Sequence, residues 1–318
     1  MSNDILVIAE HIGGVVAEIS YEIVAKAKDT AAATGGRVVV ALLGSDAAGL
    51  AGSFGSDATV YVDDPALAEF NPEACAKVIA ALMEERTPRA TLLGSTSVGM
   101  DLAAWLSVKT GQPCVAYVND LAFENGAMLA TSQIYGGKVM AEVVPQGDSV
   151  VMTVLAGVAD AEAGRGSTAA EQIRSPVSLD GLKTRFVKLI APEDGDIDIT
   201  SQEKLVAVGR GIGGDDNIEL AEELAEALGA EVAASRPVTD AGWLPKTRQV
   251  GKSGLAVKPK IYLMLGISGA PEHLEGMKDS EMIIAVNTDA NAPIFDVAHY
   301  GSTCDLFDVA EAMLEKLA

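Results

Sequence analysis

A glycine-rich turn is the first segment whose residue types and spacing could do chemistry. Gly209-Arg210-Gly211-Ile212-Gly213-Gly214 has the spacing G-x-G-x-x-G, and it lies between an apolar run that starts at Lys204 and a helical pattern at 217–228. Backbone N–H groups in such a turn, together with the helix N-terminus, can face a ligand phosphate. The structural alternative is a strand-to-helix turn that binds nothing.

The residues further along do not complete an ordinary NAD site. A strand that binds NAD ribose ends in an acidic residue about 20 positions after the glycines, and this sequence has Ser235-Arg236 there. An NAD-dependent dehydrogenase is therefore disfavoured. An arginine at this place can instead meet a phosphate or the edge of a flavin ring.

Two more loops could contact a ligand. The polar loop Gln249-Val250-Gly251-Lys252-Ser253-Gly254 is not a P-loop, because Lys246 stands where that motif requires glycine. The segment Gly266-Ile267-Ser268-Gly269-Ala270-Pro271-Glu272-His273 follows a strongly apolar run. We expect it at the carboxyl edge of a sheet, where doubly wound domains bind ligands, and it is a second candidate phosphate cradle.

The remaining polar candidates have ordinary structural explanations as well. His273 could be a helix-start residue, Asn287 ends an apolar run, and Asp305 stands where a helix N-cap is expected. The sequence has no G-x-S-x-G elbow, no H-x-x-x-H pair and no carboxylate cluster, so it predicts neither a catalytic triad nor a metal site. Glycine turns, one arginine and hydroxyl donors favour the binding of a reactive cofactor.

Composition restricts the class of protein. The 318 residues carry 23 Lys and Arg against 45 Asp and Glu, and the formal charge of -22 disfavours binding to nucleic acid or to anionic lipid. Three widely spaced cysteines predict neither a disulfide framework nor a thiolate metal site. Without a signal-like N-terminus or a long apolar run, we expect no membrane insertion and a cytoplasmic protein, or an organelle-matrix protein after transit-peptide removal.

The first half of the chain predicts an α/β domain. Short apolar runs alternate with helical patterns, which indicates a parallel sheet. The expected strands lie at 5–10, 38–44, 59–64 and 90–95, and the expected helices at 17–34, 72–86 and 97–110. After about residue 114, apolar runs are separated by Asn125-Gly126 and Gly136-Gly137, which are hairpin dipeptides, so antiparallel strands are expected to extend the sheet.

The second half predicts a separate doubly wound domain. An acidic, poorly apolar stretch at about 160–203, with one strand-like run at 185–191, is expected to be a linker. Alternation of strands and helices then restarts. The fold class is therefore α/β with two domains, an N-terminal parallel-sheet domain at 1–200 with an antiparallel hairpin extension, and a C-terminal doubly wound domain at 204–318.

Five spaced segments together resemble the electron transfer flavoprotein alpha subunit family. They are SRPVTDAGWLPKTRQVGKSG at 235–254, LGISGAPEHLEGMKDS at 265–280, IIAVNTDANAPIF at 283–295, YGSTCDLF at 300–307, and LVIAEH at 6–11. The resemblance covers the whole chain and is most specific after residue 204. It implies that the C-terminal domain binds FAD.

The resemblance also implies which residues bind the FAD. They are Arg210, Ser235, Arg236, Gln249, Val250, Gly251, Lys252, Ser253, Ser268, Gly269, Ala270, Pro271, Glu272, His273, Asn287, Asp305 and Leu306. Ser235 and Arg236 match positions beside the isoalloxazine ring, and Ser253 stands where the family commonly has a threonine that reaches toward the flavin N5. The turn 268–273 matches the phosphate-binding turn, with His273 toward the O2 edge. Asn287, Asp305 and Leu306 match contacts to the adenosine half.

The resemblance implies an electron carrier in place of a substrate-converting enzyme. The chain would form a heterodimer with a beta subunit through its N-terminal domain. It would take electrons from dehydrogenases such as the acyl-CoA dehydrogenases of fatty acid beta-oxidation and pass them to an acceptor of the electron transfer flavoprotein-quinone oxidoreductase type. Cationic Arg236 and a donor at His273 would stabilise negative charge on the reduced flavin.

Three alternatives stay open. The WLPKTRQVGKSG segment, with Lys246 and Arg248 near the flavin loop, resembles an electron-bifurcating branch of the family, in which the beta subunit holds a second FAD and oxidises NADH. A dehydrogenase that binds NAD at the glycine turn is a second alternative. A module that senses an adenine nucleotide without redox chemistry is the third.

Overall fold

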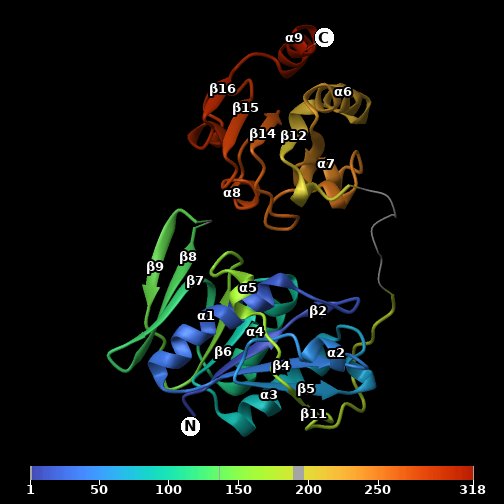
Figure 1. Cartoon of the computed structure of the whole chain (residues 1–318). Helices are drawn as coiled ribbons and strands as arrows, with labels where there is room; N and C mark the ends of the chain where they lie inside the picture. The colour runs from blue at the N-terminus through green and yellow to red at the C-terminus, as the bar shows by residue number, and fades with distance from the viewer. Residues whose placement is uncertain (1, 136, 189–196, 318) are drawn as a thin grey trace. The chain divides into compact units, whose positions relative to one another are not determined.

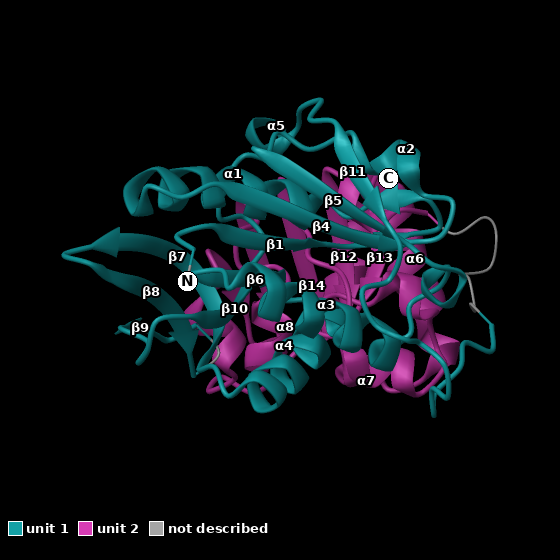
Figure 2. Cartoon of the chain, turned by 90° about the horizontal axis from the view of Figure 1, so that it is seen from below, with its two compact units in different colours: residues 1–188 teal, residues 189–318 magenta. Residues whose placement is uncertain are grey.

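The chain divides into two compact units. The computed structural model describes residues 2–135, 137–188 and 197–317, and the units are Met1–Lys188 and Leu189–Ala318 (Figures 1 and 2). Each is an α/β fold with its own sheet and its own apolar core, as the sequence predicts. Within the described residues, no helix combines the length and the apolar content that crossing a membrane would require.

The described part of the first unit contains a nine-stranded sheet. Its strands, in spatial order, are β11 (Ala170–Ile173), β5 (Ala58–Asp63), β4 (Val38–Gly44), β1 (Ile5–Ala9), β6 (Ala90–Gly94), β10 (Val150–Val154), β7 (Cys114–Glu124), β8 (Ala127–Ile134) and β9 (Val139–Val143). Neighbours from β11 to β7 pair in parallel, and β7, β8 and β9 pair antiparallel. The hairpin extension that the sequence predicts thus forms one edge (Figure 1). A separate two-residue hairpin joins β2 (His11–Ile12) to β3 (Val15–Val16).

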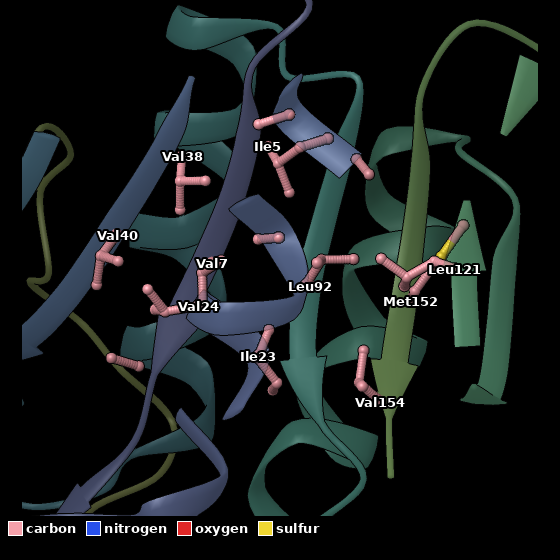
Figure 3. Packing of buried hydrophobic residues seen from close by; sticks show 14 of the residues in the cluster. Ile5, Val7, Ile23, Val24, Val38, Val40, Leu92, Leu121, Met152 and Val154 are labelled. Carbon is pink, nitrogen blue, oxygen red and sulfur yellow. The ribbon is translucent and has the colours of Figure 1, made fainter. Parts of the chain in front are cut away.

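Helices cover both faces of this sheet, because successive strand residues point to opposite faces. Ile5 and Val7 of β1 pack into one core, where Figure 3 shows Val7 against Val24 of α1 (Glu18–Thr34). Leu6 and Ile8 pack into the other. That second core is covered by α3 (Pro72–Arg86) and α4 (Ser97–Thr110), and the short helices α2 (Ala48–Ala51) and α5 (Ala161–Gly164) complete the unit.

The structure differs from the sequence prediction at β10 and β11. The run that forms β10 was expected to continue the antiparallel set, but β10 pairs in parallel with β6 and β7. All five of its residues are buried, which is typical of a central parallel strand. The expected linker contains α5 and β11, and β11 extends the first sheet beside β5. The strand-like run at 185–191 forms no strand at 185–188, and its remainder lies outside the described residues, as does Gly136.

The second unit has a five-stranded parallel sheet. Its spatial order is β13 (Glu231–Ala234), β12 (Lys204–Val208), β14 (Ile261–Leu265), β15 (Met282–Val286) and β16 (Tyr300–Ser302). Renumbered within the unit this is 2-1-3-4-5, a doubly wound order in which the chain reverses direction across the sheet between its first and third strands. The strand β16 was not predicted, because three residues leave too short an apolar pattern.

The second sheet also has a core on each face. On one face, α6 (Ile218–Leu228) and α9 (Leu306–Leu317) pack on alternate residues of β12 and β14. The other face is covered by loops and by the short helices α8 (Pro271–Leu274) and η6 (Pro293–Asp296). A further short helix, α7 (Arg236–Asp240), follows β13 directly. Both faces are therefore closed, and the ends of the strands are where a ligand can approach.

The N-cap of α3 gives a test of how the segment 183–184 is held. Asn71 is 6% exposed, and its Oδ1 accepts hydrogen bonds from the N–H groups of Glu73 and Ala74 and from Thr184 Oγ1. Its Nδ2 donates to the Thr184 carbonyl. We expect Asn71→Ala to lower the free energy of unfolding by about 2–3 kcal/mol, because a buried cap and two long-range bonds are lost together.

Chemical denaturation of the full chain measures this loss. The control is Asp160→Ala, which removes a single exposed cap bond to Glu162 N–H and should cost less than about 1 kcal/mol. Equal losses in the two variants would mean that the bonds between Asn71 and Thr184 do not contribute.

Candidate functional site

The five strand ends of the second unit bring most of the predicted site residues to one edge of the sheet. Because all five strands are parallel, their carboxyl ends lie on the same side. Arg210 follows β12, Ser235 and Arg236 follow β13, and the turn 266–273 follows β14. Asn287 follows β15, and Asp305 and Leu306 follow β16.

The glycine turns after β12 and β14 contact each other at the point where the strand order reverses. Gly211 N–H donates to the Gly266 carbonyl at 3.1 Å, and a Cβ on Gly209 would lie 2.2 Å from that oxygen. Gly209 and Gly211 therefore cannot be replaced without moving the neighbouring turn. This close approach leaves main chain, not side chains, at the switch point, where ligands of doubly wound domains bind.

The turn after β14 presents three backbone donors in succession. No residue that the structure describes accepts a hydrogen bond from the N–H groups of Ser268, Gly269 or Ala270. Gly269 has φ +85°, and a Cβ there would lie 2.3 Å from the nitrogen of Ile294. Ile294 N–H in turn donates to the Ser268 carbonyl at 3.0 Å, which fixes the turn. Successive unpaired N–H groups in a turn form an anion-binding concavity, so this segment fits a phosphate.

The loop 249–254 is brought to the same edge by hydrogen bonds to β13. Val250 N–H donates to the Ala234 carbonyl at 2.9 Å, and Ala234 forms a parallel bridge with Gln249. Gln249 is 4% exposed; its Oε1 accepts from Thr239 Oγ1 at 2.6 Å, and its Nε2 donates to Ser253 Oγ at 3.0 Å. Ser253 Oγ accepts in this bond, so its own proton is directed elsewhere.

The same loop is joined to α8 at its other end. Lys252 N–H donates to the Glu272 carbonyl at 2.7 Å. Gly251 has φ +134°, and a Cβ there would lie 2.7 Å from the same carbonyl oxygen, so the position requires glycine. The side chain of Lys252 is exposed, and its Nζ lies 3.8 Å from Glu275 Oε2. The loop and the turn after β14 therefore form one hydrogen-bonded structure.

His273 lies inside this structure and is 6% exposed. Its Nδ1 is 3.1 Å from the Val250 carbonyl oxygen, and its Nε2 is 3.2 Å from the hydroxyl of Tyr262. Desolvation by burial lowers the pKa of His273 to about 4, with the Val250 carbonyl acting in the opposite direction. The imidazole is therefore neutral at physiological pH and adds no positive charge to the site.

The cationic residues of the site lie on its exposed side. Arg236 begins α7, and its Nε donates to Asp240 Oδ2 at 3.1 Å, with 67% of the arginine side chain exposed. Arg210 is exposed in the turn after β12. Positive charge near the edge of the sheet thus comes from these arginines.

Three residues that were predicted to contact the ligand also have structural roles; they are Asn287, Asp305 and Leu306. Asn287 Nδ2 donates to the Ile267 carbonyl at 2.9 Å, which supports the turn after β14. Asp305 Oδ1 accepts from Phe307 N–H at 2.9 Å at the start of α9, and Leu306, the first residue of that helix, is 7% exposed in the core. The expected N-cap at Asp305 is present.

Two family models cover most of the chain. The electron transfer flavoprotein domain matches residues 5–178, and the electron transfer flavoprotein FAD-binding domain matches residues 198–278. The second match begins before β12 and extends past the loop 249–254 and the turn after β14, which contain most of the predicted site residues. The chain belongs to the electron transfer flavoprotein alpha subunit family. The resemblance to this family that the sequence shows is therefore confirmed.

Relatives of this family are similar over nearly the full length. The electron transfer flavoprotein subunit alpha of Methylophilus methylotrophus is 36% identical, with 99% of each chain covered. The acryloyl-CoA reductase electron transfer subunit beta of Anaerotignum propionicum is 35% identical, with 99% of this chain and 95% of the relative covered. A subunit of lactate dehydrogenase (NAD(+),ferredoxin) from Acetobacterium woodii is 33% identical over 98% of this chain and 76% of its own length.

Membership of the electron transfer flavoprotein alpha subunit family supports a role in electron transfer, with a bound flavin and a beta subunit as partner.

Two residues of the candidate site were not predicted from the sequence. Tyr262 and Thr239 bond directly to His273 and Gln249, respectively. Neither has a motif of its own, and Tyr262 belongs to an apolar strand pattern that predicts a core residue.

The buried His273 predicts a pH dependence of stability. Its pKa falls from an ordinary 6.5 to about 4 on folding, so below pH 6.5 the unfolded chain binds a proton that the folded chain does not. We expect the contribution of His273 to be complete above pH 6.5 and to fall by about 3 kcal/mol as the pH drops to 4.

The measurement is the free energy of unfolding of the wild type and of His273→Asn between pH 7.5 and pH 4. The difference between the two proteins should shrink as the pH falls, because groups common to both cancel. A constant difference across this range would contradict a buried neutral imidazole.

Proposed function

We propose that this chain is the alpha subunit of a heterodimeric electron transfer flavoprotein and that its second unit binds FAD at the carboxyl edge of the sheet. The observation that carries the proposal is the row of N–H groups at Ser268, Gly269 and Ala270, which have no acceptor among the described residues and lie directly beside the glycine contact at the switch point. A dinucleotide carries a pyrophosphate, and such donors bind it without a positively charged side chain.

The chain offers donors for each part of the FAD. The turn 268–273 would hold the phosphates, and Arg210 would lie on their exposed side. Asn287, Asp305 and Leu306 would contact the adenosine half. Ser235, Arg236 and the loop Gln249, Val250, Gly251, Lys252 and Ser253 would border the isoalloxazine ring, with the free proton of Ser253 available to a flavin nitrogen.

Bound FAD would supply reversible one- and two-electron chemistry. In this proposal the protein provides position and charge. The guanidinium of Arg236 keeps two terminal nitrogens free of partners among the described residues, because Asp240 is bonded through Nε. A cation beside the ring favours the extra electron by electrostatic attraction.

The proposed redox partners follow from the family. The first unit would associate with a beta subunit that completes the flavin pocket. Dehydrogenases, such as those that act on acyl-CoA esters, would deliver electrons, and an acceptor of the flavoprotein-quinone oxidoreductase type would remove them. We place the protein in the cytoplasm.

A second candidate function is electron bifurcation, with NADH oxidised at another FAD in the beta subunit. What favours it is the similarity to a subunit of a lactate dehydrogenase that is named for both NAD(+) and ferredoxin. Lys246 and Arg248 in η5 (Lys246–Arg248), just before the flavin loop, belong to the segment that resembles this branch.

Flavin stoichiometry separates these functions. The chain is produced together with its beta subunit, and the flavin released on denaturation is counted and identified. We expect one FAD per heterodimer for the simple carrier, and two with reduction by NADH for the bifurcating complex. A heterodimer purified without any flavin, and unable to bind added FAD, would contradict both and would favour the nucleotide-sensing alternative.

The electrostatic role of Arg236 is tested by the flavin potential. Arg236→Ala should lower the midpoint potential of the flavin by on the order of 30 mV, because one partly exposed charge beside the ring is lost. Arg236→Lys is the matched control, which retains the charge and should recover most of the potential. Spectroelectrochemical titration of the heterodimer measures it, and an unchanged potential in the alanine variant would exclude this role.

A further inference from the structure

The hydroxyl of Tyr262 is buried and contacts His273, whose other ring nitrogen contacts the loop 249–254. Tyr262 is the second residue of β14 and is fully buried in the core on the face that α8 covers. Its hydroxyl is 3.2 Å from His273 Nε2, and the two ring centroids are 6.1 Å apart. A phenylalanine would bury the same apolar ring, so packing alone does not explain a buried hydroxyl, which is costly unless it is hydrogen-bonded.

The partners of His273 determine where its proton lies. Nδ1 faces the Val250 carbonyl at 3.1 Å, and a carbonyl oxygen can only accept, so Nδ1 carries the hydrogen. A neutral imidazole has one N–H, which leaves Nε2 as an acceptor for the hydroxyl of Tyr262. Burial raises the pKa of Tyr262 and lowers that of His273, so both stay neutral and this pattern persists at physiological pH.

The Val250 carbonyl is the point at which this pair reaches the loop. Val250 N–H donates to Ala234, so the residue is held from β13 on one side and from His273 on the other. The next residues, Gly251 and Lys252, lie against the Glu272 carbonyl. The pair therefore connects the core of the sheet to the residues that precede Ser253.

We propose that Tyr262 is a positioning residue for the loop 249–254, because its hydroxyl donates to His273 Nε2 and keeps the imidazole oriented so that Nδ1–H donates to the Val250 carbonyl. The part of this inference that concerns the loop is independent of the ligand. The part that concerns the flavin rests on the function proposed above.

The tautomer can be measured in the wild-type chain without any variant. The full-length chain is labelled with ¹⁵N-histidine, and the imidazole nitrogens of its three histidines are observed by NMR. His273 is assigned from the signal lost in His273→Asn. We expect Nδ1–H with an unprotonated Nε2, and an Nε2–H tautomer would overturn the proposal.

Tyr262→Phe tests the mechanical link to the loop. Loss of the hydroxyl leaves Nε2 without its donor and the imidazole free to turn away from the Val250 carbonyl, so the tautomer should become mixed. Amide hydrogen exchange in the peptide 249–254 should become faster by about tenfold, which corresponds to one lost hydrogen bond. Tyr300→Phe is the matched control, because Tyr300 is 64% exposed and its hydroxyl has no partner among the described residues. It should change neither quantity.

Flavin binding is then compared in heterodimers that contain each variant. We expect FAD to dissociate about tenfold more readily from Tyr262→Phe than from the wild type, and the Tyr300→Phe complex to behave as wild type. Unchanged exchange and an unchanged tautomer in Tyr262→Phe would refute the positioning role. Faster exchange in Tyr262→Phe, together with a wild-type heterodimer that binds no FAD, would refute the proposed function and leave the positioning role intact.

Discussion

The second unit is organised by the contact between two glycine turns at the reversal of strand order. Gly209 and Gly266 approach so closely that a side chain on either would collide with the other turn. The approach is possible because both turns follow strands that are paired directly in the sheet, β12 and β14. The other parts of the site are connected to this contact. The row of N–H donors follows Gly266 in the turn after β14, and the loop 249–254 is hydrogen-bonded to α8, which follows the same turn.

Most of the fold was predictable because strands and helices have different apolar periods. The helix at 97–110 was predicted with the bounds that the structure has, since Thr96 caps it and Gly111 ends it. The pairing of β10 was not predictable in the same way. Its residues form one apolar run that suits any buried strand, and only the tertiary structure decides that it inserts between β6 and β7. The strands β11 and β16 are short edge strands with little apolar pattern.

The candidate site was predictable to the extent that topology alone determines it. Residues that follow parallel strands must gather at one edge, so Arg210, Ser235 and the turn after β14 could be placed from the sequence. The contacts of Tyr262 and Thr239 could not. Each bonds to a residue ten or eleven positions away through a loop whose course the sequence does not specify. A tyrosine within an apolar run is indistinguishable from a core residue until its hydroxyl has a partner.

The charges of the site explain how a strongly acidic chain could hold an anionic cofactor. Two cations at this edge each have a carboxylate neighbour, in the pairs Arg236–Asp240 and Lys252–Glu275, and Arg210 is exposed beside them. His273 is neutral because it is buried. Neighbouring carboxylates balance much of this positive charge, so in the proposed site the backbone N–H groups of Ser268, Gly269 and Ala270 would be the main donors to a pyrophosphate. The turn is fixed by the bond from Ile294 N–H to the Ser268 carbonyl and continues into α8. Phosphate binding at the proposed site would therefore depend on the geometry of the turn more than on the net charge of the protein, which would leave Arg236 to act on the flavin.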